Sequence, residues 1–170
     1  RRDILELLDF GVAEAKGFDK VPHQGTFNAN PLSAAAGVAM LGQVAEGDVT
    51  ARANEQGDKL KAAWNAVFAA EGVPWATFGL GSSVYVFTNP DGLDIDPENF
   101  DATLQPIQVM EIGGNHPACK SFRLAMLVNG VDISPKPGGI VSAVHGDDDI
   151  AEAAEAVRAS IAMLKAEGQL

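Results

Sequence analysis

A polar turn that leads directly into a helix of small residues is the feature that most constrains this chain. The turn covers residues 23–30, and the helix begins at Pro31. Asn30 is a good helix cap, and a proline at the first helical position needs no amide partner. Alanine and glycine over residues 34–37 allow a second backbone to approach closely. We therefore expect a helix over residues 31–46 that ends at Gly47.

The same turn has two interpretations. Amide groups and the hydroxyl of Thr26 suit a phosphate group, which binds where backbone N–H groups converge. The alternative is a tight turn before a buried helix, in which the Thr26 hydroxyl bonds the local backbone, as turn threonines commonly do. The residues alone leave both interpretations open.

Size and charge restrict the classes of partner. The 170 residues suffice for one domain, or for a small domain plus part of another. A net charge of −11 argues against nucleic acids and anionic membrane surfaces as partners. No apolar run approaches the ~20 residues that span a bilayer, and the single cysteine, Cys119, excludes an internal disulfide. We expect a cytoplasmic protein with neither a nucleic-acid nor a membrane partner.

Hydrophobic periodicity predicts the elements of the first 71 residues. Residues 1–10 show apolar positions typical of a short helix with one buried stripe. Glycines and a proline over residues 11–24 indicate a loop. Beyond the helix at 31–46, Asp48 is expected to cap a long helix over residues 49–71. Its apolar stripe consists of Ala53, Leu60, Ala63, Trp64, Val67 and Phe68.

The remaining residues predict a small sheet with covering helices. Residues 75–78 and 83–88 alternate in the manner of a hairpin, with the turn at 79–82. Helices are expected over 100–110 and 118–129, strands over 131–134 and 139–144, and a last helix that begins within the aspartates 147–149. This order predicts an α+β fold around a small, mostly antiparallel sheet.

Two ordered motifs carry a resemblance to a known family. Residues 23–37, HQGTFNANPLSAAAG, resemble the pattern H-x-G-T-F-x-x-N-P-x-x-x-A-A-G of class III pyridoxal-phosphate-dependent aminotransferases, especially the glutamate-1-semialdehyde aminomutase-like members. Downstream, the sequence resembles the same family's A-M-L-x-x-G-V, P, S-x-x-H and D-I pattern. The matching positions are Ala125-Met126-Leu127, Gly130-Val131, Pro135, Ser142, His145 and Asp149-Ile150.

The resemblance implies a division of the chain and a cofactor. Residues 1–47 resemble the tail of the large cofactor-binding domain, and residues 48–170 resemble the small C-terminal domain. The implied enzyme is a homodimer that transfers an amino group between an amine or amino acid and a keto acid. In the family, the residues matching Gly25 and Thr26 reach the phosphate of the pyridoxal 5'-phosphate bound to the neighbouring subunit.

The implied chemistry needs residues that these 170 positions do not offer. A pyridoxal-phosphate aminotransferase requires a lysine that forms a Schiff base and an acid for the pyridine nitrogen. Every lysine here lies in a polar loop or on a charged helix face, where its pKa stays high. The resemblance places the Schiff-base lysine upstream of Arg1. We therefore expect a piece of a longer polypeptide that is inactive alone and contains no catalytic residue.

Several alternatives remain. In aminomutases a glutamate lies in the loop before S-x-x-H, whereas residues 136–139 here contain no acid, so aminotransferase is the primary interpretation and intramolecular amino transfer the alternative. A non-catalytic assembly or binding domain is a third possibility. The dispersed His23, His116 and His145 do not predict a metal site. His145 is expected to orient the end of a strand through a backbone hydrogen bond, and the acidic run to cap a helix.

Overall fold

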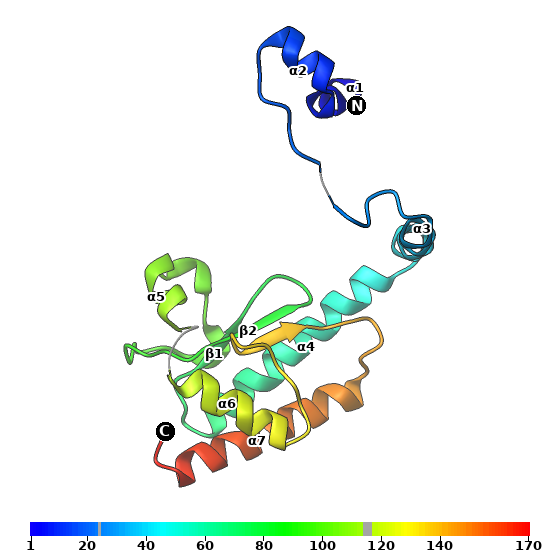
Figure 1. The fold of residues 1–170 in the computed structure, drawn as a ribbon. Coiled ribbons are helices and arrows are strands. Elements are labelled where there is room, and N and C mark those ends of the chain that lie inside the picture. The colour runs from blue at the N-terminus through cyan, green and yellow to red at the C-terminus, as the bar shows by residue number, and fades with distance from the viewer. Residues whose placement is uncertain (24, 114–116) are drawn as a thin grey trace. The chain divides into compact units, whose positions relative to one another are not determined.

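The computed structural model describes residues 1–23, 25–113 and 117–170, and its elements are arranged as two compact units (Figure 1). The first unit is Arg1–Ala45 and the second is Glu46–Leu170. This division lies close to the boundary expected between residues 47 and 48. The assignment of the two parts to a large and a small domain stays a prediction.

The first unit is helical, with the elements α1 (Arg2–Leu5), η1 (Glu6–Leu8), α2 (Phe10–Lys16) and α3 (Pro31–Glu46). The predicted α3 is confirmed with its expected bounds. Asn30 Oδ1 accepts hydrogen bonds from the amides of Leu32 and Ser33, at 3.0 and 3.2 Å. The cap and the proline at the first position therefore start the helix as the sequence indicates.

Two predictions for the first unit were wrong. Residues 10–16 form α2 instead of belonging to a loop, because Asp9 accepts a hydrogen bond from the Val12 amide at 3.1 Å and Gly17 ends the helix at φ 69°. Gly11 inside this helix is not a breaker. The apolar stripe expected within residues 1–10 is not buried either, because Ile4, Leu5 and Leu7 are exposed.

The second unit contains one antiparallel sheet and its covering helices. Its elements are α4 (Val49–Ala70), β1 (Ala76–Phe78), β2 (Ser83–Phe87), η2 (Pro97–Asn99), η3 (Ala102–Leu104), α5 (Ile107–Gly113), α6 (Pro117–Val128), β3 (Gly138–Ile140) and α7 (Asp147–Ala166). The strand order is β1-β2-β3, and both pairs are antiparallel. The predicted α+β class and the hairpin of residues 75–88 are confirmed.

The core of the second unit lies between the sheet and the helices α4, α6 and α7. The buried face of α4 includes Leu60, Trp64, Val67 and Phe68, which confirms most of the predicted stripe. Phe122 of α6 is fully buried and packs edge to face on Trp75, with ring centroids 5.3 Å apart. Apolar side chains from segments far apart in sequence thus form one continuous core.

Gly57 marks the closest approach between α4 and the hairpin turn. A Cβ at this position would lie 2.5 Å from the carbonyl oxygen of Gly81 and 2.7 Å from the Cα of Ser82. Asn54, one turn earlier on α4, accepts a hydrogen bond from the Ser82 amide at 3.0 Å. A glycine therefore lets the helix backbone contact the turn directly. The expected cap at Asp48 is absent, since its side chain makes no capping hydrogen bond.

The central part of the unit differs from the prediction. The helix expected over residues 100–110 is replaced by η2, η3 and α5, since Asp96 and Asp101 accept amide hydrogen bonds from Glu98 and Thr103 and start separate short turns. Pro106 then lacks the N–H that would continue a helix.

The sheet is also smaller than predicted near its last strand. Residues 131–134 form no strand, because the Ile133 carbonyl accepts a hydrogen bond from Arg123 Nε at 2.8 Å in place of a strand partner. The strand expected over residues 139–144 shortens to β3. Within the described residues, no helix has the length and apolar character needed to cross a membrane.

Candidate functional site

The turn of residues 25–30 is tightly folded by its own backbone. The Asn28 amide donates to the Gly25 carbonyl oxygen at 3.1 Å, and the Asn30 amide donates to the Phe27 carbonyl oxygen at the same distance. Ala29 has a left-handed φ of 58°. A Cβ on Gly25 would lie 2.8 Å from Asn28 Oδ1, so a larger residue there would require the exposed Asn28 side chain to move. The turn therefore leads into α3 with a defined backbone path.

Thr26 lies on this turn with its side chain exposed. Within the part of the chain that the structure describes, its hydroxyl has no hydrogen-bond partner. The local backbone bond that was one expected use of this hydroxyl is therefore not formed. Residues 23–30 contain no acidic side chain that would repel an anion. Hydroxyl and backbone donors without a nearby carboxylate suit the chemistry of a phosphate group.

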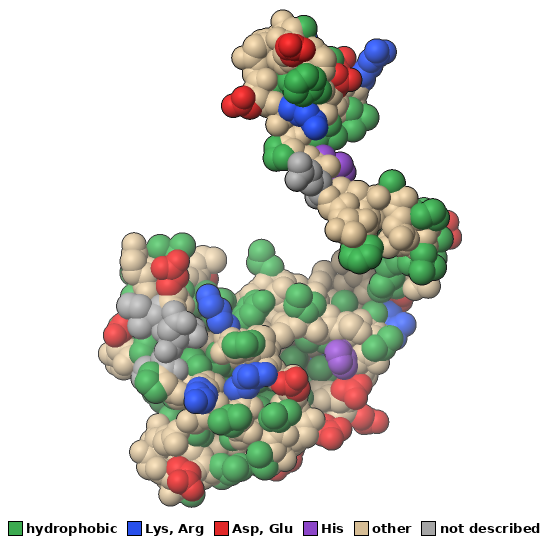
Figure 2. Space-filling model, viewed as in Figure 1, with side chains coloured by type: hydrophobic (Ala, Val, Ile, Leu, Met, Phe, Trp, Pro, Cys, Tyr) green, Lys and Arg blue, Asp and Glu red, His purple; other side chains and the backbone are tan. Residues whose placement is uncertain are grey.

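The helix that follows exposes apolar side chains around its surface. No residue of α3 is buried, and the exposed side chains include Leu32, Val38, Met40 and Leu41. Figure 2 shows hydrophobic side chains, drawn in green, gathered on this helix, which can be located from Figure 1. A helix that is apolar on all sides is normally covered by protein. The alternative of a buried helix is therefore not realised within this unit itself.

His145 has the role that was expected for it. Its Nδ1 accepts a hydrogen bond from the Ser142 amide at 3.0 Å, and Ser142 Oγ accepts one from the Val144 amide at 3.2 Å. Because Nδ1 is the acceptor, the neutral imidazole carries its proton on Nε2. The S-x-x-H motif thus fixes the backbone between β3 and α7.

The acidic run at the start of α7 is used in local contacts. Asp149 Oδ2 accepts a hydrogen bond from the Gly146 amide at 2.7 Å, in agreement with the predicted capping role. Asp147 Oδ1 lies 2.7 Å from Lys59 Nζ, and this contact lowers the pKa of the Asp147 carboxyl. Among the residues that the structure describes, no three His, Cys, Asp or Glu side chains lie together as a metal site would require. His116 lies outside the described residues.

Three lysines of the second unit are engaged in ion pairs. Lys59 contacts Asp147 and Glu55, and the hydrogen bond to Asp147, followed by that to Glu55, raises its pKa. Lys61 lies 2.8 Å from Asp58, and Lys165 contacts Glu71. A charged, paired ammonium is a poor nucleophile, because the unprotonated amine is the reactive form. That none of these lysines forms a Schiff base stays a prediction.

A pocket in the second unit was not predicted. Its volume is about 330 Å³, and its walls come from α4, β2, β3, the segment after α6 and the first turns of α7. Trp64 and Glu152 lie among its wall residues. Residues this distant in sequence share no local motif, so no sequence signal indicated the pocket.

Comparisons with known proteins agree with the resemblance seen in the sequence. The chain is 28% identical to a glutamate-1-semialdehyde 2,1-aminomutase of Methanosarcina acetivorans over 158 residues, which are 92% of this chain and 32% of that relative. No protein-family model matches the chain. The chain therefore spans about a third of the length of this curated relative.

Solved structures show where the fold recurs. A transaminase with PLP bound superposes with a TM-score of 0.71 at 27% identity, covering 100% of this chain and 35% of that one. An omega-transaminase from Sphaerobacter thermophilus superposes with a TM-score of 0.66 at 22% identity, covering 95% of this chain and 34% of that one. The second likeness concerns the fold alone.

Proposed function

We propose that this chain, which matches the C-terminal part of pyridoxal-phosphate-dependent aminotransferases in sequence and fold, forms part of a class III aminotransferase. The proposed enzyme transfers an amino group between an amine or amino acid and a keto acid. Pyridoxal phosphate, when bound, supplies the electron sink for this chemistry. The observation that carries the proposal is the superposition of the whole chain on a transaminase with PLP bound.

Gly25 and Thr26 are the residues of this chain that we assign to the cofactor. The Thr26 hydroxyl is exposed and lacks a partner in the described residues, so it is available as a donor to a phosphate oxygen. Gly25 lets the Asn28 side chain lie close to the turn backbone, because a side chain at position 25 would require it to move. Together they hold one end of the cofactor. The proton chemistry belongs to a lysine that we place outside these 170 residues.

We further propose a homodimer in which this turn completes the phosphate site of the partner subunit. The exposed apolar surface of α3 supports this proposal, because the turn leads directly into that helix. Residues 1–47 then belong to the large cofactor-binding domain and residues 48–170 to the small domain. The compartment that we propose for the enzyme is the cytoplasm, in keeping with a single cysteine, Cys119.

The test uses the full-length protein that contains these residues. We expect it to purify with a visible absorbance band that borohydride removes, because borohydride reduces the lysine–cofactor linkage. Thr26→Val removes the hydroxyl at nearly constant volume, and we expect it to weaken cofactor retention about tenfold. Thr50→Val is the matched control, since Thr50 is also an exposed threonine but lies on α4. Equal retention by the two variants would remove Thr26 from the cofactor site.

Intramolecular amino transfer is the second candidate, because the Methanosarcina acetivorans relative is an aminomutase. The loop of residues 136–139, which precedes Ser142, contains no acid, whereas the resemblance implies a glutamate in this loop of aminomutases. An aminotransferase requires a separate keto acid to regenerate its cofactor, whereas an aminomutase turns over without one. Turnover of glutamate-1-semialdehyde without an added keto acid would favour the aminomutase. Absence of any cofactor from the full-length protein would favour a non-catalytic assembly domain.

A further inference from the structure

The pocket of the second unit has walls suited to an apolar body. Leu60, Val84, Val131, Val141 and Ile150 line it, and Ile150 and Val141 are also part of the buried core. Its volume of about 330 Å³ falls within the ~300–1,000 Å³ that ligand pockets occupy. All of these walls belong to the second unit. The space is therefore large enough for a small organic molecule.

The charged side chains that line this pocket are acidic. Asp132, Asp149 and Glu152 line it, and the described wall residues include no lysine or arginine. Asp132 Oδ1 lies 3.6 Å from Arg123 Nη2, and Asp149 Oδ2 accepts a hydrogen bond from the Gly146 amide. Glu152 makes no ion pair within the described part of the chain. An unpaired carboxylate beside apolar walls favours a cation over an anion.

One further wall residue provides a hydrogen-bond donor. His145 uses Nδ1 as an acceptor, which leaves Nε2–H as a donor. The indole N–H of Trp64 has no hydrogen-bond partner among the described residues, but this atom is itself buried and is not counted as a donor to the pocket.

We propose that this pocket binds a small organic cation that has an apolar body and a hydrogen-bond acceptor. Glu152 contacts the cationic group, the aliphatic walls enclose the body, and the acceptor reaches the Nε2–H donor of His145. This inference is independent of the proposed aminotransfer, since it uses only residues of the second unit.

The test compares two probes of the same shape on the full-length protein. Choline carries a quaternary ammonium and a hydroxyl, and 3,3-dimethylbutan-1-ol replaces the charged nitrogen with carbon. Neither probe has a primary amine, so neither can serve as an amino donor. By titration calorimetry we expect choline to bind at least about fivefold more tightly than the alcohol, a ratio typical of one partly exposed charge contact.

Single substitutions test whether choline binds in this pocket. Glu152→Gln should weaken the binding of choline about fivefold and leave the binding of the alcohol unchanged, because the substitution removes only the charge contact. Asp148→Asn is the control, since it removes one charge from the same helix at a residue outside the pocket wall.

Several outcomes would overturn the proposal. Equal binding of choline and the alcohol would show that the pocket does not select charge. An equal effect of Glu152→Gln and Asp148→Asn would assign the selectivity to the general field of an acidic protein. No binding of either probe would mean that the pocket is filled by another segment or holds only water. Cofactor retention is measured separately, so failure here leaves the proposed aminotransfer intact.

Discussion

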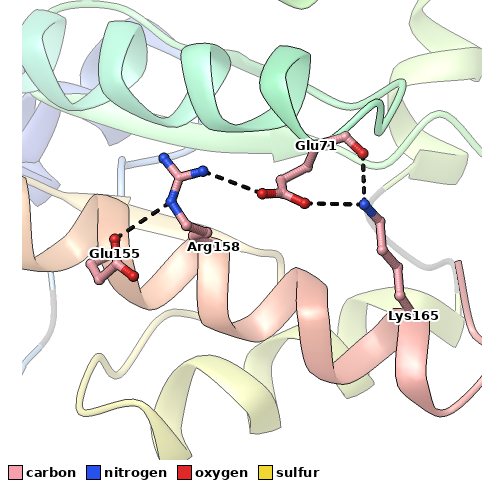
Figure 3. A network of polar contacts seen from close by, with 4 residues as sticks. All are labelled: Glu71, Glu155, Arg158 and Lys165. Carbon is pink, nitrogen blue, oxygen red and sulfur yellow. Dashed lines mark hydrogen bonds and ion pairs between the residues drawn. The ribbon is translucent and has the colours of Figure 1, made fainter.

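Lys165 Nζ lies 2.6 Å from the carbonyl oxygen of Glu71 and 3.1 Å from its carboxylate Oε2. Arg158 Nη1 approaches the other carboxylate oxygen of Glu71 at 3.2 Å and also lies near Glu155, as Figure 3 shows. Glu71 directly follows the last residue of α4. Two cations from α7 thus offset an acidic residue at a helix C-terminus, where negative charge is unfavourable.

Replacement of Lys165 by methionine should reduce the acid sensitivity of the fold. The hydrogen bond from Lys165 is the main cause that lowers the pKa of Glu71 below its ordinary 4.5, with Arg158 adding to it. A carboxyl whose pKa is lower in the folded state stabilises the fold above its unfolded pKa, and this contribution disappears as the pH falls through the folded pKa.

Lys165→Met should therefore be less stable than the parent at pH 7, and the difference should shrink at about pH 3. Urea midpoints at the two pH values measure this. Lys120→Met, on an exposed residue of α6, is the control. A difference that persists unchanged in acid would mean that packing of the lysine stem, and not its charge, carries the effect.

Gly57→Ala should destabilise the second unit although alanine is the better helix former. The added Cβ would lie 2.5 Å from the Gly81 carbonyl oxygen, so the helix and the turn must separate. We expect a loss of about 2 kcal/mol, within the range for overpacked sites. Ala62→Gly, at an exposed position of the same helix, calibrates the propensity effect at about 1 kcal/mol. Higher stability of Gly57→Ala in urea unfolding would contradict the close approach.

Phe122→Ala should be among the most damaging single changes in the unit. The ring is fully buried and stacks edge to face on Trp75. Its removal leaves a cavity, for which about 3–5 kcal/mol of unfolding free energy is typical. Leu124→Ala, half exposed on the same helix, should change stability by about 0.5 kcal/mol or less. Similar losses for both variants would mean that the core does not depend on the face of α6 that carries Phe122.

The sequence predicted elements well where local chemistry sets both ends. For α3, Asn30 and Pro31 provide the start, and the structure keeps these bounds. Prediction from the sequence failed where a hydrogen bond of one side chain overrides the structure that the surrounding residues favour. Asp9 starts α2 in a segment whose glycine had indicated a loop, and Arg123 takes the Ile133 carbonyl that a strand partner would have used.

The two candidate sites also differ in whether neighbouring or distant residues form them. Gly25 and Thr26 form one contiguous motif, so the sequence alone could single them out. The pocket joins Trp64 of α4 with Glu152 of α7 and with the segment after α6. Its existence depends on packing between segments about ninety residues apart. Periodicity assigns Trp64 to a buried face and Glu152 to an exposed face, but it cannot bring the two together.

Leu41→Glu should weaken self-association of the full-length protein by about tenfold or more, as loss of a central apolar interface residue does. Leu41 is 67% exposed on α3 within this chain, and no residue of that helix is buried. A charge placed there would be desolvated if a second copy covers the helix. Leu80→Glu is the matched control, because Leu80 is 92% exposed in the hairpin turn of the other unit.

Sedimentation velocity over a range of concentrations measures the dimer fraction, and circular dichroism checks that the variants fold. We expect Leu41→Glu alone to dissociate and to lose cofactor at the same time, because Thr26 leaves the partner's phosphate site together with α3. If Leu41→Glu instead unfolds without first dissociating, α3 is covered by its own polypeptide. The turn would then act on the cofactor of its own subunit, and the proposed contribution across the dimer would be wrong.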